Sequence, residues 1–284
     1  MTDRTPKWRD MDVETRARAY SPSSVLNGSI DPFIQAYVDK SAAAYDAFRH
    51  VQTINYGPKS SNSIDLLMPS QAAPAPLHIF IHGGYWQQLS KRESFFSAVD
   101  TLARGIGFAA IDYTLAPQAS LDDIVSECCT AVSYLYENAA KLGIDHDKII
   151  VSGSSAGAQL AAMCCLKLPQ AKRPKGLILL SGIYDLEPLI GTYINDAVGM
   201  DIETARRNSP MLADVANFPN TIIAWGAQET DEFKRQSQTF ADHLTNADVP
   251  VTSFEVEARN HFDIVMDLAN DTKLGRATNG LFAF

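Results

Sequence analysis

Residues 148–163, KIIVSGSSAGAQLAAM, constrain the fold of this chain more than any other stretch of its sequence. The run IIV at 149–151 is apolar and β-branched, which is typical of a strand buried on both faces. From Ala156 onward the residues are small or favour a helix. Gly153 and Gly157 leave room for a sharp bend and for close packing. The stretch therefore predicts a buried strand, a tight turn and a helix in direct succession.

Ser155 stands in the middle of this turn, at the centre of the pattern GSSAG. In a nucleophile elbow, the central serine occupies the strained apex of such a turn and exposes its hydroxyl above the sheet. A loop that consists of small residues and has no catalytic role would show the same five-residue pattern. The pattern alone fits both interpretations, so the rest of the chain has to decide between them.

Strand and helix signals alternate along the chain from about residue 51. Strands are expected at 51–56, 63–68, 77–82, 108–113, 148–153, 176–182, 221–226 and 251–257. Helices are expected at 91–104, 120–142, 155–168, 232–246 and 262–270. The first two strands alternate apolar and polar residues, as antiparallel strands near an edge do, whereas the later ones are continuous apolar runs. This order predicts a mostly parallel eight-stranded sheet with helices on both faces.

A single α/β domain is expected to span residues 1–284, because a chain of this length can bury one large core. Residues 1–50 are expected to form an N-terminal helical extension, with Asp31 as a helix N-cap and Pro32 at the first helical position. Residues 183–218 show weak periodicity and several turn residues. We interpret them as a cap insertion over the C-terminal edge of the sheet, where open α/β sheets bind ligands.

Composition narrows the expected partners. The net charge of -9 argues against nucleic acid or an anionic membrane, and no apolar run is long enough to span a bilayer. The N-terminus has no apolar signal core, so a cytoplasmic location is expected. The cysteines are interpreted as reduced thiols, no metal-ligand spacing is visible, and we expect no cofactor. The expected partner is a small-molecule substrate, and a homodimer is one candidate for the oligomeric state.

A serine hydroxyl becomes a useful nucleophile only with a base, an orienting carboxylate and donors for the oxyanion. The segment IFIHGGYW at 79–86 follows the third expected strand and offers the donors. Gly83 and Gly84 let the backbone approach a reacting carbonyl, and the N–H of Ala156 is expected to join them. We interpret His82 as bracing this loop. A simple strand-ending turn is the alternative for the two glycines.

The carboxylate and the base are expected after the last two strands. Glu229, three residues past Gly226, is placed to reach toward a histidine, whereas Asp231 lies where a helix begins and is a candidate cap. His261 directly follows the final strand. The order Ser155, acid, His261 is the order of the triad in α/β-hydrolases. Together these signals favour Ser155 as a nucleophile.

The chain resembles the kynurenine formamidase (arylformamidase) family, within the α/β-hydrolase fold. The matching stretches are HGGYW (82–86), SSAGAQLAA (154–162), SGIYDLEPL (181–189), SP (209–210), EFKRQS (232–237) and RNHFD (259–263). The resemblance implies that Ser155 is the nucleophile and His261 the base. Alignment on the residue pair at 232–233 implies that Glu229 is the acid, at a position where the family usually has aspartate. Asp231, where proline is frequent, remains the alternative acid.

The resemblance implies hydrolysis of an N-formyl amide to an amine and formate. Tyr85 and Trp86 beside the oxyanion loop are candidates to wall an aromatic leaving group, and Tyr184 in the cap is a third candidate. Packing in the core is the alternative role for these aromatic residues. A carboxylesterase acting on small acyl esters needs the same machinery and is the competing function. A non-catalytic binding protein of the same fold is a third hypothesis, which the presence of nucleophile, acid and base disfavours.

Overall fold

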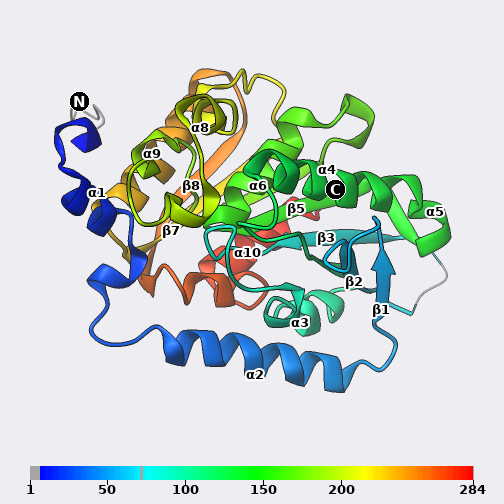
Figure 1. Ribbon diagram of the computed structural model, residues 1–284. Helices are drawn as coiled ribbons and strands as arrows, with labels where there is room; N and C mark the ends of the chain where they lie inside the picture. Colours follow the sequence, from blue (N-terminus) through cyan, green and yellow to red (C-terminus); the bar gives the residue numbers. More distant parts are fainter. Residues whose placement is uncertain (1–6, 71–72, 284) are drawn as a thin grey trace.

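Eight strands form one sheet in the computed structural model, which describes residues 7–70 and 73–283 (Figure 1). The strand order across the sheet is β1-β2-β4-β3-β5-β6-β7-β8. The strands are β1 (Gln52–Asn55), β2 (Ser63–Leu67), β3 (Ala75–Ile81), β4 (Gly107–Ile111), β5 (Ile144–Ser154), β6 (Gly176–Leu180), β7 (Asn220–Gln228) and β8 (Val251–Asn260). All eight overlap the ranges expected from the sequence.

The sheet is antiparallel at one edge and parallel elsewhere. β1 pairs with β2 and β2 with β4 in antiparallel fashion, while every other neighbouring pair is parallel. In the centre, Ile79 of β3 lies between Ala109 of β4 and Val151 of β5. Parallel strands in register end at the same edge, so the segments that follow β3, β5, β6, β7 and β8 gather there. The predicted mostly parallel, eight-stranded α/β-hydrolase sheet is confirmed.

Helices cover both faces of this sheet (Figure 1). The α-helices are α1 (Val13–Ala19), α2 (Asp31–Ala47), α3 (Ala98–Leu102), α4 (Leu121–Glu137), α5 (Ala139–Leu142), α6 (Ala156–Lys167), α7 (Asn195–Val198), α8 (Ile202–Arg207), α9 (Asp231–Asn246) and α10 (Lys273–Leu281). The 3-10 helices are η1 (Lys7–Asp10), η2 (Pro22–Val25), η3 (Lys91–Glu93), η4 (Gln170–Lys172), η5 (Glu187–Leu189), η6 (Pro210–Leu212) and η7 (Ile264–Asp267). α4, α5, α6 and α9 pack on one face, and α2, α3 and α10 on the other.

Two apolar cores therefore sandwich the sheet. Alternate residues of the central strand enter different cores: Ile79 and Ile81 join the core under α4 and α6, whereas Phe80 joins the core against α2. Successive side chains of a strand point to opposite faces, so a strand buried on both sides must be apolar at every position. This explains why the central strands are continuous apolar runs in the sequence.

The expected helix at 91–104 is wrong in its extent. Only the 3-10 turn η3 and the short helix α3 form there. The intervening polar groups bond elsewhere: Ser94 Oγ donates to the Ser90 carbonyl (2.7 Å), and the Phe95 N–H donates to Ser41 Oγ of α2 (3.0 Å). A side-chain acceptor on another helix thus replaces the local helical bond.

The expected helix at 262–270 is also wrong. The Asn260 side-chain oxygen accepts the N–H of Phe262 (2.8 Å), which makes a tight turn and leaves only η7 beyond it. The last helix instead begins after Thr272, whose hydroxyl accepts the N–H of Gly275 (3.1 Å) as a cap. At α2 the predicted cap is displaced: Asp31 is the first helical residue and Ile30 precedes it.

The two segments expected outside the strand-helix rhythm are both helical. Residues 183–218 contain η5, α7, α8 and η6, between β6 and β7. The expected N-terminal extension contains η1, α1, η2 and α2, and its first six residues lie outside the described ones. α2 runs along the outside of the molecule at the bottom of Figure 1. Within residues 7–70 and 73–283, no helix combines the length and the apolarity needed to cross a membrane.

Candidate active site

The residues singled out in the sequence meet at the C-terminal edge of the parallel strands. Gly83 and Gly84 follow β3, and Ser155 directly follows β5. Glu229 directly follows β7, and His261 directly follows β8. These segments are far apart in the chain, and the parallel register brings their ends together.

Ser155 has the backbone geometry of a nucleophile elbow. Its φ is 58° and its ψ is -121°, a conformation that non-glycine residues adopt only under constraint. Its N–H donates to the Leu180 carbonyl of β6 (2.8 Å), which holds the turn against the neighbouring strand. A Cβ at Gly157 would lie 2.0 Å from the Ile81 carbonyl oxygen, so the start of α6 can approach β3 only with glycine there. The strained backbone conformation therefore occurs at Ser155, the residue expected to act as the nucleophile.

The oxyanion loop packs directly against this elbow. A Cβ at Gly83 would lie 2.6 Å from the Ser154 carbonyl oxygen and 3.1 Å from Ser155 Cβ. Gly84 has a φ of 93°, which L side chains rarely adopt. Ala156 is the first residue of α6, so its N–H has no partner within the helix. The structure therefore brings the three predicted oxyanion donors to the same turn as Ser155.

His82 and Tyr113 support this loop through a ring contact and a hydrogen bond. Their rings stack at 4.2 Å, and the Tyr113 hydroxyl donates to the His82 carbonyl (3.0 Å). His82 Nδ1 lies 2.9 Å from the Gly83 carbonyl oxygen, and Nε2 lies 3.5 Å from an oxygen of Asp112. The histidine thus bonds within the loop through Nδ1, and its Nε2 faces Asp112 in the segment after β4. This is the bracing position expected for it.

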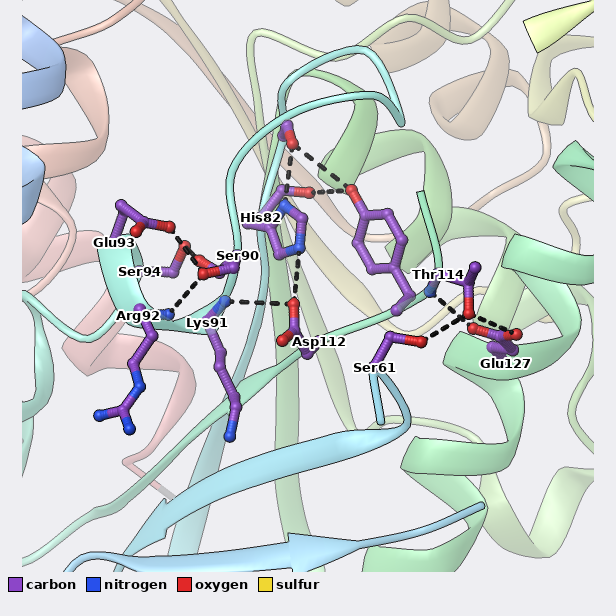
Figure 2. Close-up of polar contacts among 12 residues, drawn as sticks. Ser61, His82, Ser90, Lys91, Arg92, Glu93, Ser94, Asp112, Thr114 and Glu127 are labelled. Atoms are coloured by element: carbon purple, nitrogen blue, oxygen red, sulfur yellow. Dashed lines mark hydrogen bonds and ion pairs between the residues drawn. The ribbon is translucent and has the colours of Figure 1, made fainter. Parts of the chain in front are cut away.

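Lys91 connects Asp112, which His82 faces, to a buried ion pair with Asp65. The Lys91 N–H donates to Asp112 (3.4 Å), and its ammonium donates to Asp65 of β2 (2.7 Å; Figure 2 shows the first contact). Burial alone would raise the pKa of Asp65. Hydrogen bonds from Lys91, Thr53 and Tyr45 outweigh burial and lower that pKa below its ordinary value. The loop that carries the oxyanion donors is thus tied to the sheet by a charged group that is fully paired.

His261 and Glu229 form a buried pair. His261 Nδ1 lies 2.9 Å from Glu229 Oε2, and both side chains are almost inaccessible. The other carboxylate oxygen, Oε1, accepts the Ser181 hydroxyl (2.6 Å) and the Gly226 N–H. Phe233 of α9 meets the imidazole edge-on at 4.4 Å. One oxygen of the carboxylate is therefore fixed by the protein, while the other orients the histidine.

The alternative acid lies elsewhere. Asp231 is the first residue of α9 and is exposed to solvent, where an acidic residue interacts favourably with a helix N-terminus. The cap of that helix is Thr230, whose hydroxyl accepts the Phe233 N–H. The structure thus pairs Glu229, and not Asp231, with His261.

Ser155 and His261 open into one cavity of about 230 Å³. Its lining residues come from the oxyanion loop, the segment after it, the cap insertion, the segment after β8 and the N-terminal extension. They include Ser21, Pro22, Ser23, Ile30, Ile34, Tyr37, Phe80, His82, Gly83, Gly84, Tyr85, Gln87, Gln88, Leu89, Glu93, Ser94, Phe96, Ser154, Tyr193, Ile194, Phe262 and Val265. Within the described residues, no hydrogen bond joins Ser155 to His261, and catalytic contacts often tighten only when substrate binds.

Of the three aromatic residues expected to contact substrate, only Tyr85 lines the cavity. Trp86 is fully buried, and its Nε1 donates to Gln159 Oε1 of α6 (3.1 Å). Tyr184 is also fully buried and stacks on Phe240 of α9 at 4.2 Å. The prediction that Trp86 and Tyr184 contact substrate is therefore corrected. Both side chains turn into the core under α6 and α9 because helices cover that side of their loops.

Two contributions to the site were not predicted from the sequence. Ser21 and Ile34 bring the N-terminal extension to the cavity, although they precede the sheet by many residues. Ser181 holds the Glu229 carboxylate from the end of β6 and has a φ of 49°. Its position in the matched stretch SGIYDLEPL was the only available signal for Ser181. The N-terminal residues gave no such signal.

Comparison with known proteins identifies the family. Residues 78–264 match the family described as "alpha/beta hydrolase fold". The chain belongs to the α/β-hydrolases. It is 32% identical over 282 residues to a kynurenine formamidase of Danio rerio, with 94% of this chain and 95% of that protein covered. It is 30% identical to a kynurenine formamidase of Salmo salar, covering 93% and 94% of the two chains. The resemblance inferred from the sequence motifs is confirmed.

Solved structures of other α/β-hydrolases share the architecture. A crystal structure from Silicibacter sp. TM1040, of a protein with a provisional thioesterase name, matches with a TM-score of 0.81 and 25% identity. It covers 92% of this chain and 97% of its own. A hyperthermophilic esterase from Pyrobaculum calidifontis matches with a TM-score of 0.74 and 18% identity, covering 98% of both chains, which shows the shared fold.

As an α/β-hydrolase site, this arrangement has the parts for acyl transfer. It offers a strained serine, a histidine oriented by a buried carboxylate, and backbone N–H groups beside the serine. The cavity wall is mostly apolar and carries several aromatic rings. The described residues contain one cluster with metal-ligand spacing, Asp145, His146 and Asp147, in the strand β5 and away from this cavity.

Proposed function

We propose that this α/β-hydrolase cleaves the N-formyl amide of an aromatic amine, such as N-formylkynurenine, to the free amine and formate. The observation that carries the substrate class is the similarity to kynurenine formamidases over nearly the whole chain. The geometry supports the reaction type, because the nucleophile, the histidine and the oxyanion loop surround one cavity.

The first half of the reaction is formyl transfer to the enzyme. His261 takes the proton of Ser155 Oγ as that oxygen attacks the formyl carbon. The N–H groups of Gly83, Gly84 and Ala156 hold the negative charge that develops on the formyl oxygen. The carbon–nitrogen bond then breaks, His261 gives its proton to the leaving amine, and a formyl ester remains on Ser155.

The second half returns the enzyme to its starting state. His261 removes a proton from a water molecule, which attacks the formyl ester. The ester bond to Ser155 breaks, the serine regains its proton from His261, and formate leaves. Glu229 keeps Nδ1 of the imidazole protonated and stabilises the imidazolium that forms in both halves. No cofactor enters either half.

The shape of the cavity is consistent with an aryl leaving group. Ile34, Phe96, Phe262 and Val265 contribute apolar walls beside the catalytic side chains. An aromatic ring between such walls gains burial of apolar surface, roughly 25 cal/mol for each Å² removed from water. The oxyanion loop packs against the elbow, so its backbone N–H groups lie close to Ser155.

A carboxylesterase acting on small acyl esters is the second candidate function. The chain is 25% identical over 244 residues to an isoprenylcysteine methylesterase named as probable, from Oryza sativa subsp. japonica, which supports an ester substrate. Ester and amide hydrolysis use the same triad, so the arrangement of these residues does not favour one over the other. This match covers 59% of the methylesterase, whereas the match to the Danio rerio formamidase covers 95% of that protein.

The test compares the two substrate classes on one preparation. Formate release from N-formyl-L-kynurenine and nitrophenolate release from p-nitrophenyl acetate are measured for the wild type and for Ser155→Ala. We expect efficient formate release by the wild type, reduced at least about a thousandfold in the variant. Ester cleavage without formate release would move the function to the esterase. Unchanged activity in Ser155→Ala would refute the mechanism for both substrates, and no activity of the wild type would favour a binding protein.

The proposal also covers the partners, the location and the oligomeric state of the enzyme. We propose a small molecule as its partner, with neither nucleic acid nor membrane, because the net charge is -9 and the cavity is small. A cytoplasmic location is part of the same proposal, and a homodimer remains one candidate state.

A further inference from the structure

Glu93 contributes the sole carboxylate among the described residues that line the cavity. It ends the 3-10 helix η3, in the segment that follows the oxyanion loop, and its side chain is half-buried. Apart from His82 and His261, the other described lining residues are uncharged. A carboxylate on a mostly apolar cavity wall attracts a cation more strongly than a carboxylate on the open surface does, because it is less exposed to water.

No lysine or arginine of the described residues forms an ion pair with this carboxylate. The two neighbouring cations are engaged elsewhere: Lys91 pairs with Asp65 at 2.7 Å, and the Arg92 guanidinium packs 4.9 Å above the ring of Tyr45. Figure 2 shows both side chains running away from Glu93. The negative charge of Glu93 is therefore available to a ligand.

The position of the carboxylate is fixed by its own turn. The Ser90 hydroxyl donates to Glu93 Oε2 (2.7 Å) and accepts the Arg92 N–H (3.1 Å; Figure 2). The Ser94 hydroxyl closes the turn onto the Ser90 carbonyl (2.7 Å). Glu93 Oε2 is thus held, and the second oxygen, Oε1, has lone pairs for another donor.

We propose that Glu93 selects N-formyl arylamines that carry an ammonium group, by accepting a charged hydrogen bond from that ammonium. The proposal rests on the formamidase function and names the part of the substrate that the cavity recognises. A substrate carboxylate finds no lysine or arginine among the described lining residues. The cavity thus favours an aminoacyl side chain through its cation and disfavours a leaving group whose sole charge is an anion.

The test removes the charge from either partner. The KM for formate release is measured for the wild type and Glu93→Gln, with N-formyl-L-kynurenine and with its desamino analogue, which lacks the ammonium but keeps the ring, the formamide and the carboxylate. Glutamine keeps the oxygen that accepts the Ser90 hydroxyl, so the turn is preserved. Glu203→Gln, an exposed glutamate of α8 outside the cavity lining, is the matched control.

We expect Glu93→Gln to raise the KM for N-formyl-L-kynurenine about tenfold to a hundredfold, with little change in kcat. The KM for the desamino analogue should stay the same or fall, since a like charge is removed. Glu203→Gln should alter neither. An equal change for both substrates, or no change for either, would overturn the role of Glu93 while leaving the formamidase function standing. Absence of formate release by the wild type would instead refute the proposed function itself.

Discussion

Glu229 reaches His261 because two other groups fix the far side of its carboxylate. Ser181 Oγ and the Gly226 N–H bind Oε1, which leaves Oε2 2.9 Å from His261 Nδ1. The resemblance to kynurenine formamidases implies that aspartate is usual at this position. Glutamate is one methylene longer, and the hydroxyl at the end of β6 holds the longer side chain in a single place. We infer that Ser181 is a positioning residue for the triad.

Removal of the Ser181 hydroxyl tests this role. Ser181→Ala should lower kcat about tenfold to a hundredfold and leave KM nearly unchanged, because a hydrogen bond to a charged group is lost without altering the cavity. Ser181→Gly is the companion variant, since glycine relaxes the φ of 49° and also lacks the hydroxyl. Equal losses in both variants would assign the effect to the hydroxyl. Full activity in the glycine variant would assign it to the backbone instead.

The identity of the acid gives a second prediction for single residues. Glu229→Gln should lower kcat at least about a hundredfold, because an amide neither keeps the histidine tautomer nor stabilises an imidazolium. Asp231→Asn should change kcat by less than about twofold, since that side chain is exposed at the start of α9. The two variants are compared by steady-state kinetics on one substrate. A large loss in Asp231→Asn alone would reverse the assignment.

At the scale of secondary-structure elements, the N-terminal segment contacts two of the loops that form the site. Tyr20, at the end of α1, is fully buried, and its hydroxyl donates to Glu232 Oε2 of α9 (2.6 Å). Its carbonyl accepts the hydroxyl of Tyr85 from the oxyanion loop, and the Thr230 hydroxyl donates to the Ala19 carbonyl (2.6 Å). This segment therefore bridges the loops that carry the oxyanion donors and the acid. The residues after it form part of the cavity wall.

Tyr20→Phe isolates the contribution of the Tyr20 hydroxyl. The variant keeps the buried ring and loses the hydrogen bonds of the hydroxyl with Glu232, Arg235 and Gln236, while Arg235 still pairs with Glu232 at 2.7 Å. We expect the free energy of unfolding to fall by about 1–3 kcal/mol, and KM to rise as the wall at Ser21 loosens. Denaturant unfolding and steady-state kinetics measure the two effects. Unchanged stability would mean that the Tyr20 hydroxyl does not contribute to the bridge.

At the scale of the whole molecule, a neutral histidine lies within the core. His78 of β3 is fully buried, with Nε2 2.7 Å from Ser152 Oγ and its ring edge against Phe108. Burial lowers its pKa from 6.5 to about 3. The unfolded chain therefore binds a proton between pH 6.5 and 3 that the folded chain does not bind. The free energy of unfolding must fall as the pH falls through this window.

This linkage predicts the acid sensitivity of the fold. Below pH 6.5 the stability should decline by up to about 1.4 kcal/mol per pH unit through this group. His78→Gln has no such proton to bind, so its stability should decline less steeply between pH 6 and about 4, whatever its stability at neutral pH. Urea unfolding across this range measures the two slopes. Identical slopes would show that His78 does not carry the effect.

The sequence by itself determined the sheet, the elbow and the order of the catalytic residues. These features depend on local chemistry: apolar runs such as IIV at 149–151 favour a strand buried on both faces, and glycines at 153 and 157 allow a close turn. The same local patterns did not predict the structure of residues 91–104 and 262–270, where one continuous helix was expected in each range and only short helices form. Their polar groups bond to residues distant in the chain or in a side-chain turn, as Phe95 does to Ser41.

Only the tertiary structure decided which side chains reach the cavity. Trp86 and Tyr184 look like substrate contacts in the sequence, yet the helices packed over their loops turn both into the core. Ser21 and Glu93 carry no local signal, and they line the cavity because the segments at η2 and η3 lie beside the same edge of the sheet. The catalytic residues follow the ends of strands, and the sequence predicts where those strands end. The cavity wall follows from packing between distant segments, which no local pattern records.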